Sequence, residues 1–100
     1  MKKVINGKMY NTETAKLIES FSHKYPSDFE WLKETLYQKE TGEFFIDGEG
    51  GAASKYAEES AAGGWVYGRK ITPLTESEAQ AWVEKNADSE LYEELWEVAE

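Results

Sequence analysis

The stretch that most restricts the fold is LYQKETGEFFIDGEGG, residues 36–51, because its pattern is that of two strands joined by a tight turn. Aromatic and β-branched residues favour extended backbone, and the polar segment Glu40–Glu43 favours a chain reversal. We predict strands over residues 34–39 and 43–47, paired as an antiparallel hairpin. The preceding residues 29–33 stay undecided, since a helix-capping pattern competes there with a strand pattern.

The run Asp47-Gly48-Glu49-Gly50-Gly51 is rich in glycine and acid, which predicts a flexible exit from the second strand. Asp47 and Glu49 alternate with their neighbours, so both face one side and extend an acidic edge that is also a candidate recognition loop. A phosphate-binding P-loop is excluded, because Ser54 precedes Lys55 instead of following it and the acids repel an anion. The spacing of the acids also fails to match a calcium-binding EF-hand loop.

Two further elements are predicted near the start of the chain. Asn6-Gly7 separates two short strand-like segments and predicts a type I′ hairpin, in which both central residues need a positive φ. Residues from Asn11 or Thr12 to about His23 show helical periodicity, which predicts a helix. The apolar residues on one side of that helix are Ala15, Leu17, Ile18 and Phe21.

Residues 52–59 predict a loop or a short helix, and residues 65–71 predict a third strand that Pro73 closes. The predicted fold is α+β. It combines an N-terminal hairpin and a meander of about three strands with about three helices packed on one face of the antiparallel sheet.

The last quarter of the chain is predicted to be helical. Thr75 and Glu78 form a capping box that opens a helix to about Lys85. Asp88 or Ser89 then caps a final helix. The apolar residues that the first of these helices buries are Ala79, Trp82 and Val83.

Length and composition indicate one domain over residues 1–100, since 100 residues with 40% hydrophobic side chains suffice for one modest core. The chain has no cysteine, which excludes disulfides, thiol catalysis and cysteine zinc sites. No apolar stretch has the length of a signal peptide or of a membrane helix. We therefore expect a cytoplasmic protein that has no membrane partner.

Negative charge is concentrated in the last quarter. The net charge is −9, and residues 76–100 hold nine acids against Lys85 alone. On a helical wheel of residues 89–100, one side is apolar and the other is entirely carboxylate. The apolar residues are Leu91, Tyr92, Leu95, Trp96, Val98 and Ala99, and the acids are Glu90, Glu93, Glu94, Glu97 and Glu100.

Two interpretations of this acidic face stay open. In the first, the acids keep an exposed surface soluble. In the second, they imitate a phosphate backbone, because one charge per roughly 3 Å of helix axis is close to the spacing along a nucleic acid strand. In either case the excess of acid disfavours direct binding of DNA or RNA.

Catalysis has little support in the sequence. His23 is the only histidine, and no nucleophile motif is present, so we predict no enzyme, no catalytic residue, no cofactor and no metal site. Trp65 and Tyr67 lie between glycines and are the best candidates for an exposed contact patch.

The strings LYQKETGEFFIDGEGGAASKYA, GRKITPLTESEAQAWVEKN and LYEELWE resemble a group of small acidic proteins carried by bacterial phages and other mobile genetic elements. The resemblance extends over most of the chain, from Asn6 onward. Some small acidic proteins of such elements are anti-CRISPR inhibitors, which occupy the nucleic-acid groove of an effector complex. The resemblance therefore implies a partner with a basic groove, such as a CRISPR effector complex, in the cytoplasm of a bacterial host.

The leading hypothesis is a non-enzymatic, anti-CRISPR-like inhibitor that imitates nucleic acid. The residues predicted to contact the partner are Glu90, Glu93, Glu94 and Glu97 for charge, with Asp47, Glu49, Trp65 and Tyr67 for specificity. The first alternative is a protein–protein adaptor or regulator of a mobile element that binds through exposed aromatics. The second is a small enzyme or metal-dependent factor that uses Asp47 and Glu49. The oligomeric state stays open.

Overall fold

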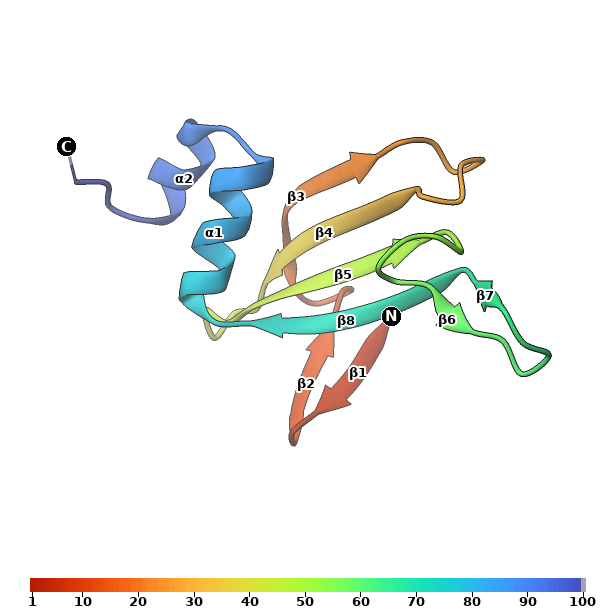
Figure 1. Cartoon of the computed structure of the whole chain (residues 1–100). Coiled ribbons are helices and arrows are strands. Elements are labelled where there is room, and N and C mark those ends of the chain that lie inside the picture. Colours follow the sequence, from red (N-terminus) through yellow and green to blue (C-terminus); the bar gives the residue numbers. More distant parts are fainter. Residues whose placement is uncertain (100) are drawn as a thin grey trace.

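The computed structural model describes residues 1–99, and within them the chain forms eight strands and two helices (Figure 1). The strands are β1 (Lys2–Ile5), β2 (Lys8–Asn11), β3 (Lys16–His23), β4 (Leu32–Gln38), β5 (Phe44–Gly50), β6 (Glu58–Glu59), β7 (Trp65–Val66) and β8 (Gly68–Leu74). The helices are α1 (Glu76–Asn86) and α2 (Ser89–Leu95). The α+β class and the antiparallel pairing are confirmed, whereas the described residues hold two helices where about three are predicted.

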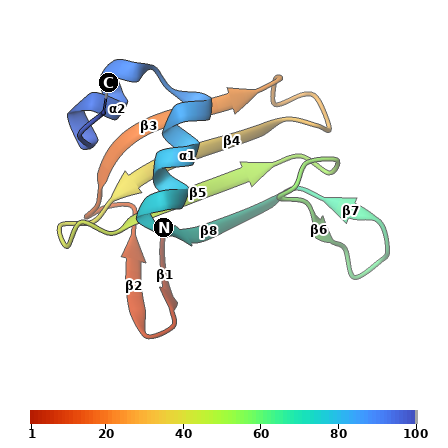
Figure 2. The ribbon, with the colours of Figure 1, turned by 60° about the vertical axis from the view of Figure 1, so that its left-hand side comes forward.

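One antiparallel sheet with the strand order β3-β4-β5-β8 forms the centre of the molecule. Strands β1 and β2 form a separate two-stranded ribbon, as do β6 and β7. Figure 2 shows α1 lying across one face of the sheet, while the β1–β2 ribbon projects from the other side. No helix among residues 1–99 has the length and hydrophobicity that crossing a membrane requires.

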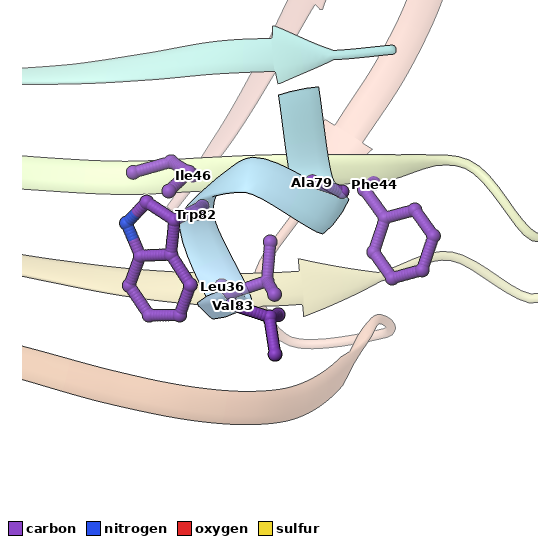
Figure 3. Packing of buried hydrophobic residues seen from close by; sticks show 6 residues of the cluster. All are labelled: Leu36, Phe44, Ile46, Ala79, Trp82 and Val83. Atoms are coloured by element: carbon purple, nitrogen blue, oxygen red, sulfur yellow. The ribbon is translucent and has the colours of Figure 1, made fainter. Parts of the chain in front are cut away.

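The alternation of β5 divides the core between the two faces of the sheet. Phe44 and Ile46 point toward α1, and Phe45 between them points to the opposite face. The buried helix-side cluster consists of Leu36, Phe44, Ile46, Ala79, Trp82 and Val83 (Figure 3). The buried cluster under the β1–β2 ribbon consists of Tyr10, Phe45 and Ile71.

Local signals at the two ends of the chain predict the structure correctly. Asn6 and Gly7 have φ values of 52° and 78°, and the hairpin that they join is β1–β2. The Thr75 side chain accepts a hydrogen bond from the Glu78 N–H, and the Glu78 side chain accepts one from the Thr75 N–H, so the capping box is confirmed. Helix α1 buries the three predicted residues, and Asp88 caps α2.

The predicted helix from residue 11 or 12 to about residue 23 is wrong, because residues 16–23 form strand β3 at one edge of the sheet. The register between β3 and β4 shifts between Leu17 and Glu19, which leaves Ile18 as a bulge. A bulge reverses the alternation, so Ile18 and Phe21, three residues apart, both pack on the helix-side core. This spacing imitates the periodicity of a helix.

The β4–β5 hairpin is confirmed. Of the undecided residues 29–33, the first three form a turn and its exit, and the last two begin β4. The flexible exit predicted for residues 47–51 is wrong, because β5 continues through Gly50 between β4 and β8. Residues 52–57 form turns that lead into β6, with no helix.

Tyr56 explains why glycines interrupt these strands. A Cβ atom at Gly48 would overlap the Tyr56 ring, and one at Gly68 would overlap the Tyr56 backbone carbonyl. Only glycine lets the sheet approach this residue so closely. Gly48 and Gly68 therefore form a seat for Tyr56, whereas Gly50 and Gly51 lie close to Ser54 and to the Phe29 carbonyl.

The strand that precedes α1 also differs from its prediction. The segment 65–71 is divided into β7 and β8, and β8 continues past Pro73 to Leu74. The prediction that Pro73 closes the strand is wrong, because β8 lies at the edge of the sheet, where a residue without an N–H is tolerated.

Candidate functional site

The most acidic surface lies where α1 ends and α2 begins, and we name it the acidic end. It consists of Glu84, Asp88, Glu90, Glu93, Glu94 and Glu97, all of which are exposed. Within residues 1–99, every ion pair uses an acid between Glu30 and Glu49, so none involves the acidic end. The negative charges of this surface therefore face solvent without a cationic partner from the described part of the chain.

The helix under this surface is shorter than predicted. Helix α2 ends at Leu95, so Glu97 lies in the extended segment after it, and Glu100 lies outside the described residues. No basic residue stands in the last turn of α2, and acids at that end oppose the helix dipole. Trp96 takes an extended backbone, and its ring packs 5.4 Å from Phe44 and 5.1 Å from Tyr92, measured between centroids.

The apolar side of the final segment is only partly as predicted. Its members that pack against the helix-side core are Leu91, Tyr92, Leu95 and Trp96. Val98 and Ala99 are exposed instead. A cleft of about 370 Å³ opens between α1, α2 and this segment, and four carboxylates line it: Glu84, Asp88, Glu93 and Glu97.

The acidic edge predicted at Asp47 and Glu49 is wrong for Asp47. Strand β5 is central, Asp47 is buried, and Arg69 donates to its two oxygens at 2.9 and 2.5 Å. Glu49 lies on the same face, 3.8 Å from Arg69 Nε, and accepts a hydrogen bond of 3.2 Å from the Tyr67 hydroxyl. The hydrogen bonds from Arg69 to Asp47 raise the pKa of Arg69, which keeps its guanidinium charged.

This pairing also bears on the metal-dependent alternative. Both oxygens of Asp47 are engaged by Arg69, and residues 1–99 contain no cluster of three or more His, Asp or Glu side chains placed to hold an ion.

The aromatic candidates lie far from the acidic end. The exposed fraction is 62% for Trp65 and 52% for Tyr67. Figure 1 places β7 at the opposite end of the sheet from α2. The predicted contact residues thus lie apart. Glu90, Glu93, Glu94 and Glu97 belong to the acidic end, Asp47, Glu49 and Tyr67 surround Arg69, and Trp65 is on β7. Their role in partner binding stays a prediction.

Sequence reasoning missed a buried carboxylate in the centre of the sheet. Glu34 is buried, and its Oε1 accepts a hydrogen bond of 3.0 Å from the Trp82 indole. Its Oε2 accepts from the Tyr56 hydroxyl and lies 2.8 Å from Lys55 Nζ. The alternation of β4 puts Glu34 on the same face as Leu36. A charged residue at an inward-facing position indicates a buried carboxylate with hydrogen-bond partners, and this pattern can be seen in the sequence.

The three groups that contact the Glu34 carboxylate keep it ionised by lowering its pKa. Burial acts to raise its pKa, but the hydrogen bonds from Lys55, Tyr56 and Trp82 outweigh it and lower the pKa below the usual value. The pKa of Tyr56 is raised, first by burial and then by its bond to Glu34. Glu34 is therefore an ionised acceptor, and Tyr56 keeps its proton and acts as a donor.

We expect Glu34→Gln to lower the free energy of unfolding at neutral pH by about 1–3 kcal/mol, because three donors lose an ionised acceptor. Since the folded state lowers the pKa of Glu34, its stabilisation is complete above the ordinary carboxyl pKa and is lost as the pH falls through the lower, folded value. Urea unfolding at neutral pH and at about pH 3 tests this. The gap between wild type and variant is smaller at acid pH than at neutral pH, whereas Glu59→Gln, at an exposed acid, shows no gap at either pH.

Comparison with known proteins does not add to this geometry. No family model matches the chain, and no curated protein or solved structure matches it significantly.

Proposed function

We propose that the chain is a non-enzymatic inhibitor that binds the cationic, nucleic-acid-binding surface of a bacterial defence nuclease complex. The acidic end makes the contact. The observation that carries this proposal is its set of six exposed carboxylates, with no ion pair to any cation within residues 1–99. A surface of this kind attracts lysine and arginine clusters that otherwise hold phosphates.

The needs of the fold do not account for these charges. Glutamates three or four residues apart on a helix repel each other by a few tenths of a kcal/mol, and acids in the last turn oppose the helix dipole. Two acids are exceptions. The Asp88 side chain accepts a hydrogen bond of 2.9 Å from the Leu91 N–H and caps α2, and Glu90 lies in the first turn of α2, where a negative charge is favourable. None of the five glutamates makes a hydrogen bond between side chains within the described residues.

Because α2 ends at Leu95, the acids do not follow one helix as phosphates follow a nucleic acid strand. Glu90, Glu93 and Glu94 lie on α2, and Glu97 lies in the segment after it. The proposed likeness to nucleic acid is therefore one of charge density over a surface. Partner selection then requires a second contact, for which Glu49, Trp65 and Tyr67 are the candidates.

The test is competition with DNA. Purified protein is added to CRISPR effector complexes of several types, and binding of their target DNA is followed by mobility shift at rising salt concentration. We expect one type to lose DNA binding at low salt, with inhibition that weakens as salt screens the charges. If no effector loses DNA binding even at low salt, this partner class is wrong.

A second candidate function is an adaptor that binds through aromatic side chains. The exposed β7 segment favours it, since Trp65, Val66 and Tyr67 are 62%, 45% and 52% exposed in consecutive positions. Binding of this kind tolerates salt, because apolar contacts are not screened. It would be lost in Trp65→Ala and Tyr67→Ala while the acidic end stayed intact.

A further inference from the structure

A surface of different character lies beside α1, on the helix-bearing face of the sheet. Two clefts, of about 500 and 350 Å³, adjoin there because they share four lining residues. The shared residues are Glu34, Lys55, Lys85 and Asn86. The combined depression runs from Thr72 on β8 to Phe21 on β3, across the sheet that Figure 2 shows beneath α1, and we name it the lysine trough.

Positive charge exceeds negative charge in this trough, although the chain carries a net charge of −9. Lys55, Lys70 and Lys85 line it, against the two acids Glu34 and Glu78. Within residues 1–99, neither Lys70 nor Lys85 takes part in an ion pair. The charge of Glu34 is balanced by Lys55, whose Nζ lies 2.8 Å from its Oε2, so Lys70 and Lys85 stand against Glu78 alone.

On the side of the trough that carries Lys55, the neighbouring residue Tyr56 is closely packed. Tyr56 is seated against Gly48 and Gly68, where any Cβ atom would overlap it. Its hydroxyl is bonded to the buried Glu34, and the Lys55 ammonium lies 5.4 Å from the Tyr56 ring centroid. This side of the trough is therefore held in place before a ligand enters, which limits the entropy lost there on binding.

Four apolar residues also line the trough, Ile46 and Leu74 from the sheet and Ala81 and Trp82 from α1. Apolar lining with a few convergent charged groups is the usual composition of a site for a small organic molecule. We propose that the lysine trough binds a small organic anion, a flat apolar ring system that bears a phosphate or a carboxylate. The ring lies against these apolar side chains, and Lys70 and Lys85 hold the anionic group.

This site is separate from the acidic end, so it does not depend on the proposed function. Neighbouring residues of α1 line different clefts, with Glu84 in the acidic one and Lys85 in the trough. An organic anion is repelled by the first surface and attracted by the second.

The test is an NMR titration of ¹⁵N-labelled protein with adenosine monophosphate and with naphthalene-2-carboxylate, at millimolar concentration. The NMR signal of the Trp82 indole N–H reports on binding, since this group donates to Glu34 and both residues line the trough. We expect saturable shifts of this indole signal and of the Lys70 and Lys85 amides with at least one probe. Adenosine or inorganic phosphate alone should bind at least about tenfold more weakly than the nucleotide, because each supplies half of the contacts.

Two double variants distinguish binding in the trough from attraction of the anion to the overall charge of the protein. Removing Lys70 and Lys85 together (Lys70→Ala, Lys85→Ala) should weaken binding by at least about tenfold, because charge-assisted contacts are lost. The matched control removes two exposed lysines outside the trough, Lys2→Ala and Lys16→Ala, and should leave affinity unchanged. Absence of saturable shifts with both probes, equal binding of phosphate alone, or equal loss in the control overturns the proposal.

Discussion

The variant Trp82→Ala is expected to lose about 4 kcal/mol of unfolding free energy, which is a large part of the total for a domain of this size. Trp82 belongs to the buried helix-side cluster, so removing the indole leaves a cavity between α1 and the sheet. The same change removes the donor to Glu34 Oε1 and leaves a buried carboxylate with one bond fewer. Urea unfolding followed by circular dichroism measures the loss.

Two matched variants show where the loss comes from. Trp82→Phe keeps most of the apolar volume but removes the indole N–H, so it should cost about 1–3 kcal/mol, the cost of an unsatisfied buried acceptor. Trp65→Ala truncates a tryptophan that is 62% exposed and should stay within about 0.5 kcal/mol of wild type. A loss in Trp65→Ala as large as in Trp82→Ala would contradict the assignment of the core.

Reversal of four charges at the acidic end should abolish partner binding without unfolding the chain. The changes are Glu90→Lys, Glu93→Lys, Glu94→Lys and Glu97→Lys. Charge complementarity becomes charge repulsion at the interface, and we expect affinity to fall by at least about a hundredfold. The thermal midpoint should change little, because repulsion between lysines replaces repulsion between glutamates, and the better dipole interaction at the end of α2 offsets the loss of Glu90 in its first turn.

The control variant also replaces four glutamates by lysine, so its net charge is the same, but the four positions lie outside the acidic end. Glu13, Glu40, Glu58 and Glu59 are exposed, and none takes part in an ion pair within residues 1–99. Their replacement by lysine should leave specific binding largely intact. Equal loss of inhibition in the control would show that total charge matters and the position of the acidic end does not.

Elements specified by neighbouring residues can be predicted from this sequence. The Asn6-Gly7 turn needs two positive φ values, and the Thr75–Glu78 box needs two reciprocal hydrogen bonds, so each is encoded within a few residues. Strand β3 could not be predicted in this way, because the bulge at Ile18 gives a strand the apolar spacing of a helix.

Contacts between residues that are far apart in the sequence could not be predicted. Helix α2 ends early as Trp96 packs on Phe44, which lies in β5. Glu34 and Trp82 are 48 positions apart, and Asp47 and Arg69 are 22 apart, so neither pair is visible to local patterns. The exposure of the glutamates on α2 is predicted correctly, because the amphipathic pattern of a helix is local.

Affinity capture from a lysate that contains CRISPR effectors tests the central claim most directly, with the wild-type chain and the variant with four reversed charges as paired baits. At low salt, the wild-type bait is predicted to retain an effector complex that added double-stranded DNA displaces, and the variant bait is predicted to retain none. Equal recovery on both baits, or no effector on the wild-type bait, would contradict a role for the acidic end in binding.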